Sequence, residues 1–273
     1  MNTPNEITIT SRTSFISPRR ISVIASHTFT QLVRMKVFYF LIIFALLVWG
    51  MKHLVFASIT GGDSASEQEL RLLKSTSFFA MNLFGIVMAI AATAVLIPKD
   101  IEDRTLYTIL CKPVPRLDYL IGKLLGVLAL IFISLLIMDL LMSLSLHFKC
   151  QQLIAYESDM LGMRYSQDIV DARAAELGQH GHSMSIHYAV FSIFLKAAVI
   201  ATIALLISTF STSTIFTLIL TIMVVLIGMM QADAREFVMK GTHYGEFKML
   251  SKFSYFIAIM IPDFQFMSID DGV

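Results

Sequence analysis

Charged side chains are scarce in this sequence. Asp, Glu, Lys and Arg make up 15% of its 273 residues, whereas apolar residues make up 56%. Soluble domains are about a quarter charged, so this composition excludes an ordinary soluble domain and favours a membrane protein. The formal net charge is only +1, which provides no basic excess of the kind that nucleic-acid binding requires. We therefore expect a lipid bilayer as a partner and no nucleic acid.

Cysteine is almost absent, since Cys111 and Cys150 are the only two. They fall on opposite sides of the membrane in the topology given below, so we expect no disulfide and no cysteine framework for a metal. Four histidines could meet on the outer surface and bind a metal there: His147, His180, His182 and His187. Their His-x-His spacing has no supporting carboxylate or thiolate, and a solvated loop is the simpler alternative. We predict no metal site.

Catalytic motifs are absent as well. Gly122-Lys123 is followed by Leu124 and has no Gly five residues earlier, so it is not a phosphate-binding loop. No His-Glu-x-x-His or Gly-x-Ser-x-Gly run occurs. The sequence therefore predicts that this chain is not an enzyme and that it binds no cofactor of its own.

Long apolar runs are abundant. A membrane-spanning helix needs about 20 apolar residues to cross about 30 Å of hydrocarbon. Five runs approach or exceed this length: about 37–56, 77–97, 119–148, 188–210 and 215–230. We predict an all-α fold, a polytopic transmembrane helical bundle over residues 37–230, with an external segment at 149–187.

Three segments flank the predicted bundle. Residues 1–18 are rich in Ser, Thr, Asn and Pro, which predicts a disordered tail. Residues 19–36 have apolar side chains at near-helical spacing between basic ends, which indicates an amphipathic helix in the interface. Alternatively, this helix is the cytosolic end of the first span. Residues 231–273 are expected to be external or interfacial, because their apolar run at 251–261 is too short to cross a bilayer.

Lys and Arg residues indicate the orientation of the bundle. They cluster before the first span and between the second and third spans, whereas residues 149–187 contain more acids than bases. Basic residues concentrate on the cytosolic side of membrane proteins. We therefore place the N-terminus and residues 98–123 in the cytosol.

The charged stretch 98–123 separates two of the apolar runs. Its charges cannot lie in hydrocarbon, so it must lie in water. Acids near Asp100 would complement the first turn of a helix over 100–110, and Pro113 and Pro115 would end it. A short helix fixed between two spans could act as a lever on both. The alternative is an ordinary connector with charges that set the topology.

Two charges lie inside predicted spans. Asp139 and Lys196 are each eight or nine residues from the outer end of their span, which is about 12–14 Å deep. Charges within a membrane usually pair or face a cavity. We predict an intramembrane ion pair between Asp139 and Lys196; a role in a substrate or proton path, or separate snorkelling to the interface, are the alternatives.

The central stretch also contains a run of residues with a distinctive spacing: Ile101, Glu102, Arg104, Thr105, Leu106, Leu110, Lys112, Pro113, Val114, Arg116, Tyr119, Leu120, Gly122 and Lys123. This run resembles the signature of type-2 ABC transporter permeases. Cys111 and Pro115 depart from the small polar residues more usual in that family. The family also normally has six spans, whereas this sequence predicts five.

The resemblance implies a function for this run. A cytosolic coupling helix would dock on an ABC ATP-binding subunit, which would hold the ATP and Mg²⁺, through Ile101, Glu102, Arg104, Thr105, Leu106 and Leu110. The geometry of the loop would be held by Pro113, Arg116, Gly122 and Lys123. A second permease copy and the bacterial cytoplasmic (inner) membrane are further expectations. The alternative is a non-transporting membrane scaffold or regulator.

Overall fold

The structure is a computed structural model. The described residues are 17–34, 65–102, 115–162, 184–211 and 213–242, with single positions at 39, 42–44, 46, 50, 168, 170, 172 and 175. Five helices are bounded within them: α1 (Pro18–Arg34), α3 (Ala65–Glu102), α5 (Arg116–Gly162), α7 (Ser185–Phe210) and α8 (Thr214–Thr242). The described ranges contain no strand, so the predicted all-α fold is confirmed.

Four of these helices are long and apolar enough to cross a membrane. The candidate spans are Leu70–Ala94, Arg116–Tyr156, Ser185–Phe210 and Thr214–Gln231. They correspond to the second to fifth predicted spans and confirm a polytopic bundle. The predicted first span at 37–56 lies mostly outside the described residues, as do the predicted tail at 1–18 and most of 231–273.

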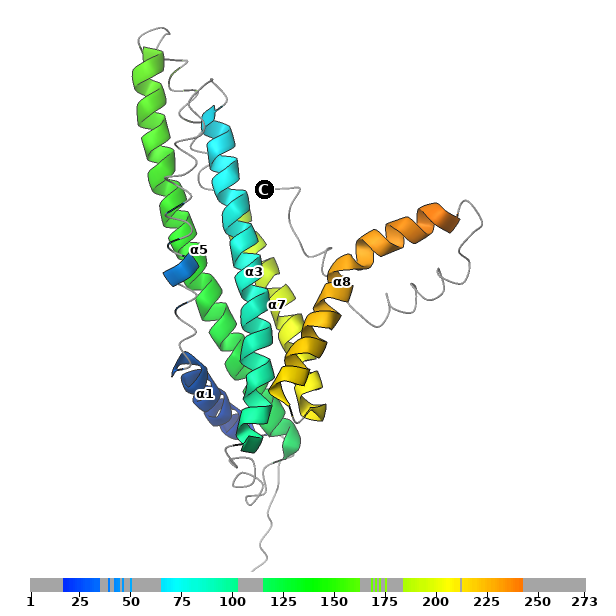
Figure 1. The fold of residues 1–273 in the computed structure, drawn as a ribbon. Coiled ribbons are helices and arrows are strands. Elements are labelled where there is room, and N and C mark those ends of the chain that lie inside the picture. The colour runs from blue at the N-terminus through cyan, green and yellow to red at the C-terminus, as the bar shows by residue number, and fades with distance from the viewer. Residues whose placement is uncertain are drawn as a thin grey trace, which may run out of the picture.

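Helices α3 and α5 are longer than the predicted spans and extend beyond the other helices (Figure 1). The 47 residues of α5 correspond to about 70 Å, and a bilayer's hydrocarbon core is about 30 Å thick. No Pro interrupts α5 and no Gly occurs between Gly126 and Gly162, so nothing stops the helix at Phe148, where we predicted the span to end. The first part of the predicted external segment at 149–187 is therefore the last part of α5.

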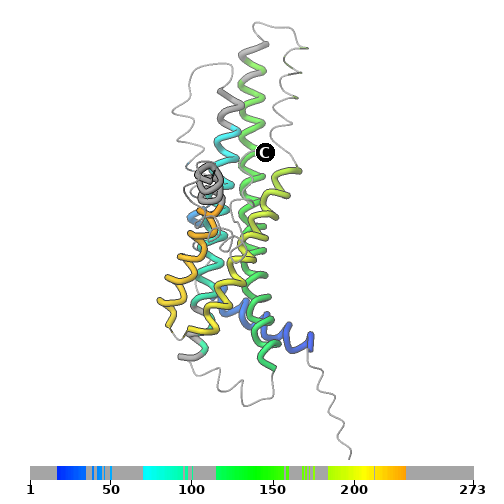
Figure 2. The backbone as a smooth tube through the Cα atoms, turned by 90° about the vertical axis from the view of Figure 1, so that its right-hand side faces the viewer, coloured from blue at the N-terminus to red at the C-terminus, as the bar shows by residue number. Residues whose placement is uncertain are grey.

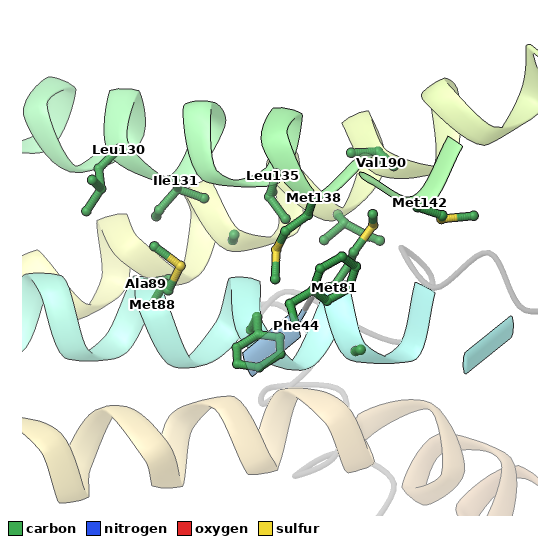
Figure 3. Close-up of a cluster of buried hydrophobic side chains, with 14 of the residues drawn as sticks. Phe44, Met81, Met88, Ala89, Leu130, Ile131, Leu135, Met138, Met142 and Val190 are labelled. Carbon is green, nitrogen blue, oxygen red and sulfur yellow. The ribbon is translucent and has the colours of Figure 1, made fainter. Parts of the chain in front are cut away.

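The core lies where α3, α5 and α7 face one another. Methionines from α3 and α5 meet between the helices, with aliphatic side chains around them (Figure 3). Met81 and Met138 have no exposed surface. Gly85 lies at the contact with α7, where an added Cβ would meet only ordinary contacts, at 3.5 Å from Ile193 and 3.7 Å from Ala197.

Helix α8 leaves the bundle after a tight turn. The Ser213 amide donates to the Ser211 side-chain oxygen at 3.2 Å, and the Thr217 amide donates to the Ser213 carbonyl at 3.1 Å. These bonds reverse the chain between α7 and α8. Helix α8 then lies on the other side of α3 and α7 from α5 (Figures 1 and 3).

Helix α1 lies across the lower end of α5 (Figure 2). Two glycines of α5, one turn apart, make room for it. A Cβ on Gly122 would lie 2.8 Å from the Cβ of Ile24, and a Cβ on Gly126 would lie 2.7 Å from the Cβ of Thr28. The buried face of α1, which includes Thr28 and Leu32, therefore packs against protein, and the amphipathic pattern of 19–36 reflects this contact.

Substituting Gly126 with Ala should destabilise the protein by roughly 1–3 kcal/mol, the usual cost of overpacking. The new Cβ would also lie 2.8 Å from the Ala25 carbonyl oxygen, which is backbone and cannot rotate away. Thermal unfolding in detergent measures the effect. Gly85→Ala is the matched control and should be tolerated, because its Cβ would meet only ordinary contacts. Equal stability of the two variants would contradict the close approach of α1.

Candidate functional site

The last turn of α3 and the first turns of α5 are joined by a buried ion pair. The Lys123 Nζ lies 2.6 Å from the Asp100 Oδ2, and the two side chains are only 4% and 8% exposed. The Tyr119 hydroxyl donates to the same carboxylate oxygen, and the Lys123 ammonium lies 5.6 Å from the centre of the Tyr119 ring. We call these three residues, Asp100, Tyr119 and Lys123, the clasp.

A second carboxylate anchors α1 beside the clasp. Asp118 has no exposed surface. Its Oδ2 lies 3.2 Å from the Arg20 Nε and accepts a hydrogen bond of 3.4 Å from the Ser17 amide, directly before α1 begins. An acid at a helix N-terminus is favoured by the helix dipole and by the free amides there. Asp118 thus holds the N-terminal end of α1 against the first turn of α5.

These contacts surround the two ends of one segment of the chain. Residues 103–114 connect the end of α3 to Pro115, just before α5 begins. Because a buried ion pair requires close geometry to offset the loss of water, the clasp keeps the two ends at a set separation. A force applied to residues 103–114 would therefore act on α3, α5 and α1 together. We call the end of the bundle that carries the clasp the loop end.

The structure locates only some of the predicted docking residues. Ile101 and Glu102 belong to the last turn of α3, so Asp100 does not begin a separate helix as we predicted. The helix continues through Pro98 to Glu102, although a proline there removes one backbone hydrogen bond of the helix. The other predicted docking and loop residues lie outside the described residues: Arg104, Thr105, Leu106, Leu110 and Pro113.

The structure describes the three predicted loop residues that belong to α5. Arg116 is the exposed first residue of α5, Gly122 contacts α1, and Lys123 forms the ion pair of the clasp. Sequence reasoning missed Asp100, Tyr119 and Asp118 as partners. One signal was present, since Tyr119 and Lys123 are four residues apart and so lie on one face of a helix.

The structure gives Asp139 a different partner from the predicted Lys196. The Asp139 Oδ2 lies 2.8 Å from the His187 Nδ1. Lys196 follows His187 by nine residues on α7, which is about two and a half turns, so the two side chains leave α7 on opposite faces about 13 Å apart along the axis. Phe194 confirms which face meets α5, because its ring centre lies 5.2 Å from that of Phe132.

The error came from comparing depths. We assumed that the third and fourth spans end at the same level, but α5 extends well beyond the level at which α7 begins (Figure 1). Asp139 is therefore level with the start of α7 rather than with its middle. Lys196 is buried, at 3% exposure, on the face of α7 away from α5.

The histidines do not form a metal centre within the described part of the chain. No group of three or more His, Cys, Asp or Glu side chains is found there. The His147 Nε2 lies 3.1 Å from the Gln151 Nε2, and His187 contacts Asp139. His180 and His182 lie outside the described residues.

Comparison with known proteins places the chain in a family. The sequence model of the family described as "ABC-2 family transporter protein" matches residues 22–261, and the chain belongs to this family. It is thus a membrane permease component of ABC transporters and not itself a catalytic subunit. No curated protein and no solved structure matches the chain.

Replacing Lys123 with Met should destabilise the protein by about 3–5 kcal/mol, because the Asp100 carboxylate would stay buried without its cation. Adding Asp100→Asn to the same chain should recover most of the loss, since a neutral pair needs no compensating charge. Chemical or thermal unfolding in detergent gives both values. If the double variant is less stable than Lys123→Met alone, the clasp does not depend on the ion pair.

The two candidate partners of Asp139 can be separated by double-mutant cycles. Asp139→Asn and His187→Gln should show a coupling energy of about 0.5–1 kcal/mol, as expected for a partly exposed pair. Asp139→Asn and Lys196→Met should be additive, because distant sites couple little. The unfolding free energies of the single and double variants decide the result. Coupling only in the second cycle would overturn the assignment of His187.

Proposed function

We propose that this chain is the membrane-spanning subunit of an ABC transporter whose ATP-binding subunit docks on the segment from Glu102 to Pro113. The observation that supports this most strongly is the clasp, in a chain of the ABC-2 family. A docking segment is useful only if its movement reaches the bundle. The buried Asp100–Lys123 pair and the Tyr119 hydrogen bond supply that connection at both ends of the segment.

In this mechanism, closure of two ATP-binding subunits pushes on the docking segment. Because α3 and α5 are joined at the clasp, they move together rather than sliding past one another. Helix α1 follows, since Gly122, Gly126 and Asp118 hold it on α5. Helix α8 then moves relative to these three helices, because only 28% of its candidate span is buried inside the chain. Substrate crosses the membrane as the bundle alternates between two packings.

The loop end would face the cytosol of a bacterial cell. The basic residues of α1 and of the start of α5 lie at this end of the bundle: Arg19, Arg20, Arg34 and Arg116. This arrangement agrees with the rule that basic residues remain on the cytosolic side. A second permease copy would complete the transporter, as a homodimer or heterodimer with two ATP-binding subunits.

Co-purification tests this function. An ATP-binding subunit encoded beside this chain, or a homologous subunit co-expressed with it, should be recovered with the tagged wild-type chain. Charge reversal by Glu102→Arg should reduce the recovery at least tenfold, because it replaces an acid in the proposed docking surface with a base.

Asp159→Arg is the matched control, since it reverses an exposed acid at the opposite end of α5. It should leave the recovery unchanged. Loss of the ATP-binding subunit in both variants would point to general misfolding, and retention in Glu102→Arg would reject the docking surface. If a soluble partner is recovered through residues 149–187 instead, the result would favour the alternative of a non-transporting membrane scaffold or regulator.

A further inference from the structure

The contact between Asp139 and His187 lies at the end of α7 that is farther from the loop end, and the proposed mechanism does not use it. His187 is the third residue of α7, and α5 continues to Gly162 past Asp139. Figure 1 shows α5 extending well beyond the level at which α7 begins. The contact therefore joins the first turn of α7 to the side of the longer helix α5.

Helix α7 supplies no negative charge to its own N-terminus. Met184 precedes the helix without a side-chain capping hydrogen bond, and the first turn contains no acid. A helix N-terminus favours an anion and disfavours a cation. A protonated His187 in this turn therefore depends on a carboxylate from another helix. Asp139 of α5 supplies one, because its Oδ2 lies 2.8 Å from the His187 Nδ1.

Asp139 depends on His187 in turn. The Asp139 side chain is only 17% exposed, and its second oxygen, Oδ1, is buried without a hydrogen-bond partner. A neutral His187 ring can offer the carboxylate only an uncharged N–H, whereas a protonated ring offers a charge-assisted hydrogen bond. Charge-assisted bonds are roughly twice as strong as neutral ones. The attraction between α5 and α7 at this point therefore depends on the charge of His187.

His187 can exchange protons with the surrounding solution. Its side chain is 47% exposed, so water reaches the ring while the carboxylate that it contacts is largely covered. Histidine is the side chain that ordinarily changes charge between pH 5 and 8. Mild acid therefore strengthens the contact between the two helices, and mild alkali weakens it.

Other titratable groups belong to the same end of the three packed helices. Among the described residues they are Tyr188 and Lys196 on α7, His147 and Lys149 on α5, and Arg71 and Lys74 on α3. None of these groups is an acid, so none can replace Asp139 as the partner of a protonated His187. Their effects on either side chain alone cancel in a double-mutant cycle.

We propose that Asp139 and His187 form a pH-sensitive latch between α5 and α7. At mildly acidic pH, the protonated His187 holds the first turn of α7 against α5. At mildly alkaline pH, the neutral ring holds it less tightly, and the first turn opens more often. Partly exposed ion pairs contribute modestly, so the latch changes the ratio of closed to open by about two- to fivefold.

The role of the latch in the cell rests on the proposed function, which places the loop end in the cytosol and this end outside. The pH of the outer solution would then bias the position of α7, as histidine protonation biases other two-state elements. Helix α7 leads through its turn at residues 211–213 into α8, the helix that moves in the proposed mechanism. Acid outside would therefore favour the packing in which α7 stays on α5.

A double-mutant cycle of Asp139→Asn and His187→Gln at two pH values tests the latch. Unfolding in an uncharged detergent gives the coupling free energy, which should be about twice as large at about pH 5.5 as at about pH 8. Carboxylates are ordinarily ionised at both values, so the difference reports the charge of the histidine. Equal coupling at the two pH values, or larger coupling at about pH 8, would overturn the proposal.

His147→Gln is the matched control, because it removes another exposed histidine from the same end of α5. The His147 Nε2 contacts the Gln151 side chain rather than an acid. In this background, the coupling between Asp139 and His187 should keep the same pH dependence. If the pH dependence disappears with His147, the assignment of the latch to His187 is wrong.

Hydrogen exchange of the wild type gives a second test that does not depend on the folding of any variant. The amides of residues 189–192 bond to carbonyls in the first turn of α7, so their exchange follows its opening. After correction for the intrinsic pH dependence of exchange, they should be about two- to fivefold less protected at about pH 8 than at about pH 5.5. Protection that is equal or higher at about pH 8 would overturn the latch.

Both measurements use the chain alone, without ATP or the ATP-binding subunit. Their failure is therefore distinguishable from failure of the docking test at Glu102.

Discussion

A carboxylate and an ammonium that meet away from water impose the main constraint on this bundle. Asp100 and Lys123 are more than nine-tenths buried and 2.6 Å apart. Removing either partner would leave a buried charge, which costs several kcal/mol. The pair therefore resists separation of α3 from α5, and Tyr119 strengthens it from the same helix face. A hydrophobic contact in the same place would allow sliding, because apolar packing is not directional.

The other features of the loop end build on this constraint. Gly122 lies beside Lys123, and it lets α1 reach the backbone of α5 one residue from the ion pair. Asp118 lies beside Tyr119 and binds the start of α1. Three helices are thus connected within the first three turns of α5. Helix α8 is outside this group and joins the bundle mainly through α3 and α7, so the structure has a tightly connected part and a more loosely attached helix.

Sequence patterns predicted the spans better than the contacts between them. The apolar runs at 77–97, 188–210 and 215–230 lie within observed helices, because hydropathy and length are local properties. The ends were less predictable, since α5 continues past Phe148 where no Pro or Gly stops it. The partner predicted for Asp139 was wrong, because which side chains meet depends on how far one helix extends past another. The Asp100–Lys123 contact was missed because Asp100 was expected to begin a separate helix, whereas it lies in the last turn of α3.

The central claim is that the clasp makes the end of α3 and the start of α5 a single moving unit. Pulsed electron paramagnetic resonance measures this directly, with spin labels at the exposed positions Ala91 and Leu117, and with a second pair at Leu117 and Ile215 on α8. When ATP is added to the complex with its ATP-binding subunit, the distance between Ala91 and Leu117 should stay constant while the distance between Leu117 and Ile215 changes. A change between Ala91 and Leu117 that accompanies ATP binding would contradict the account.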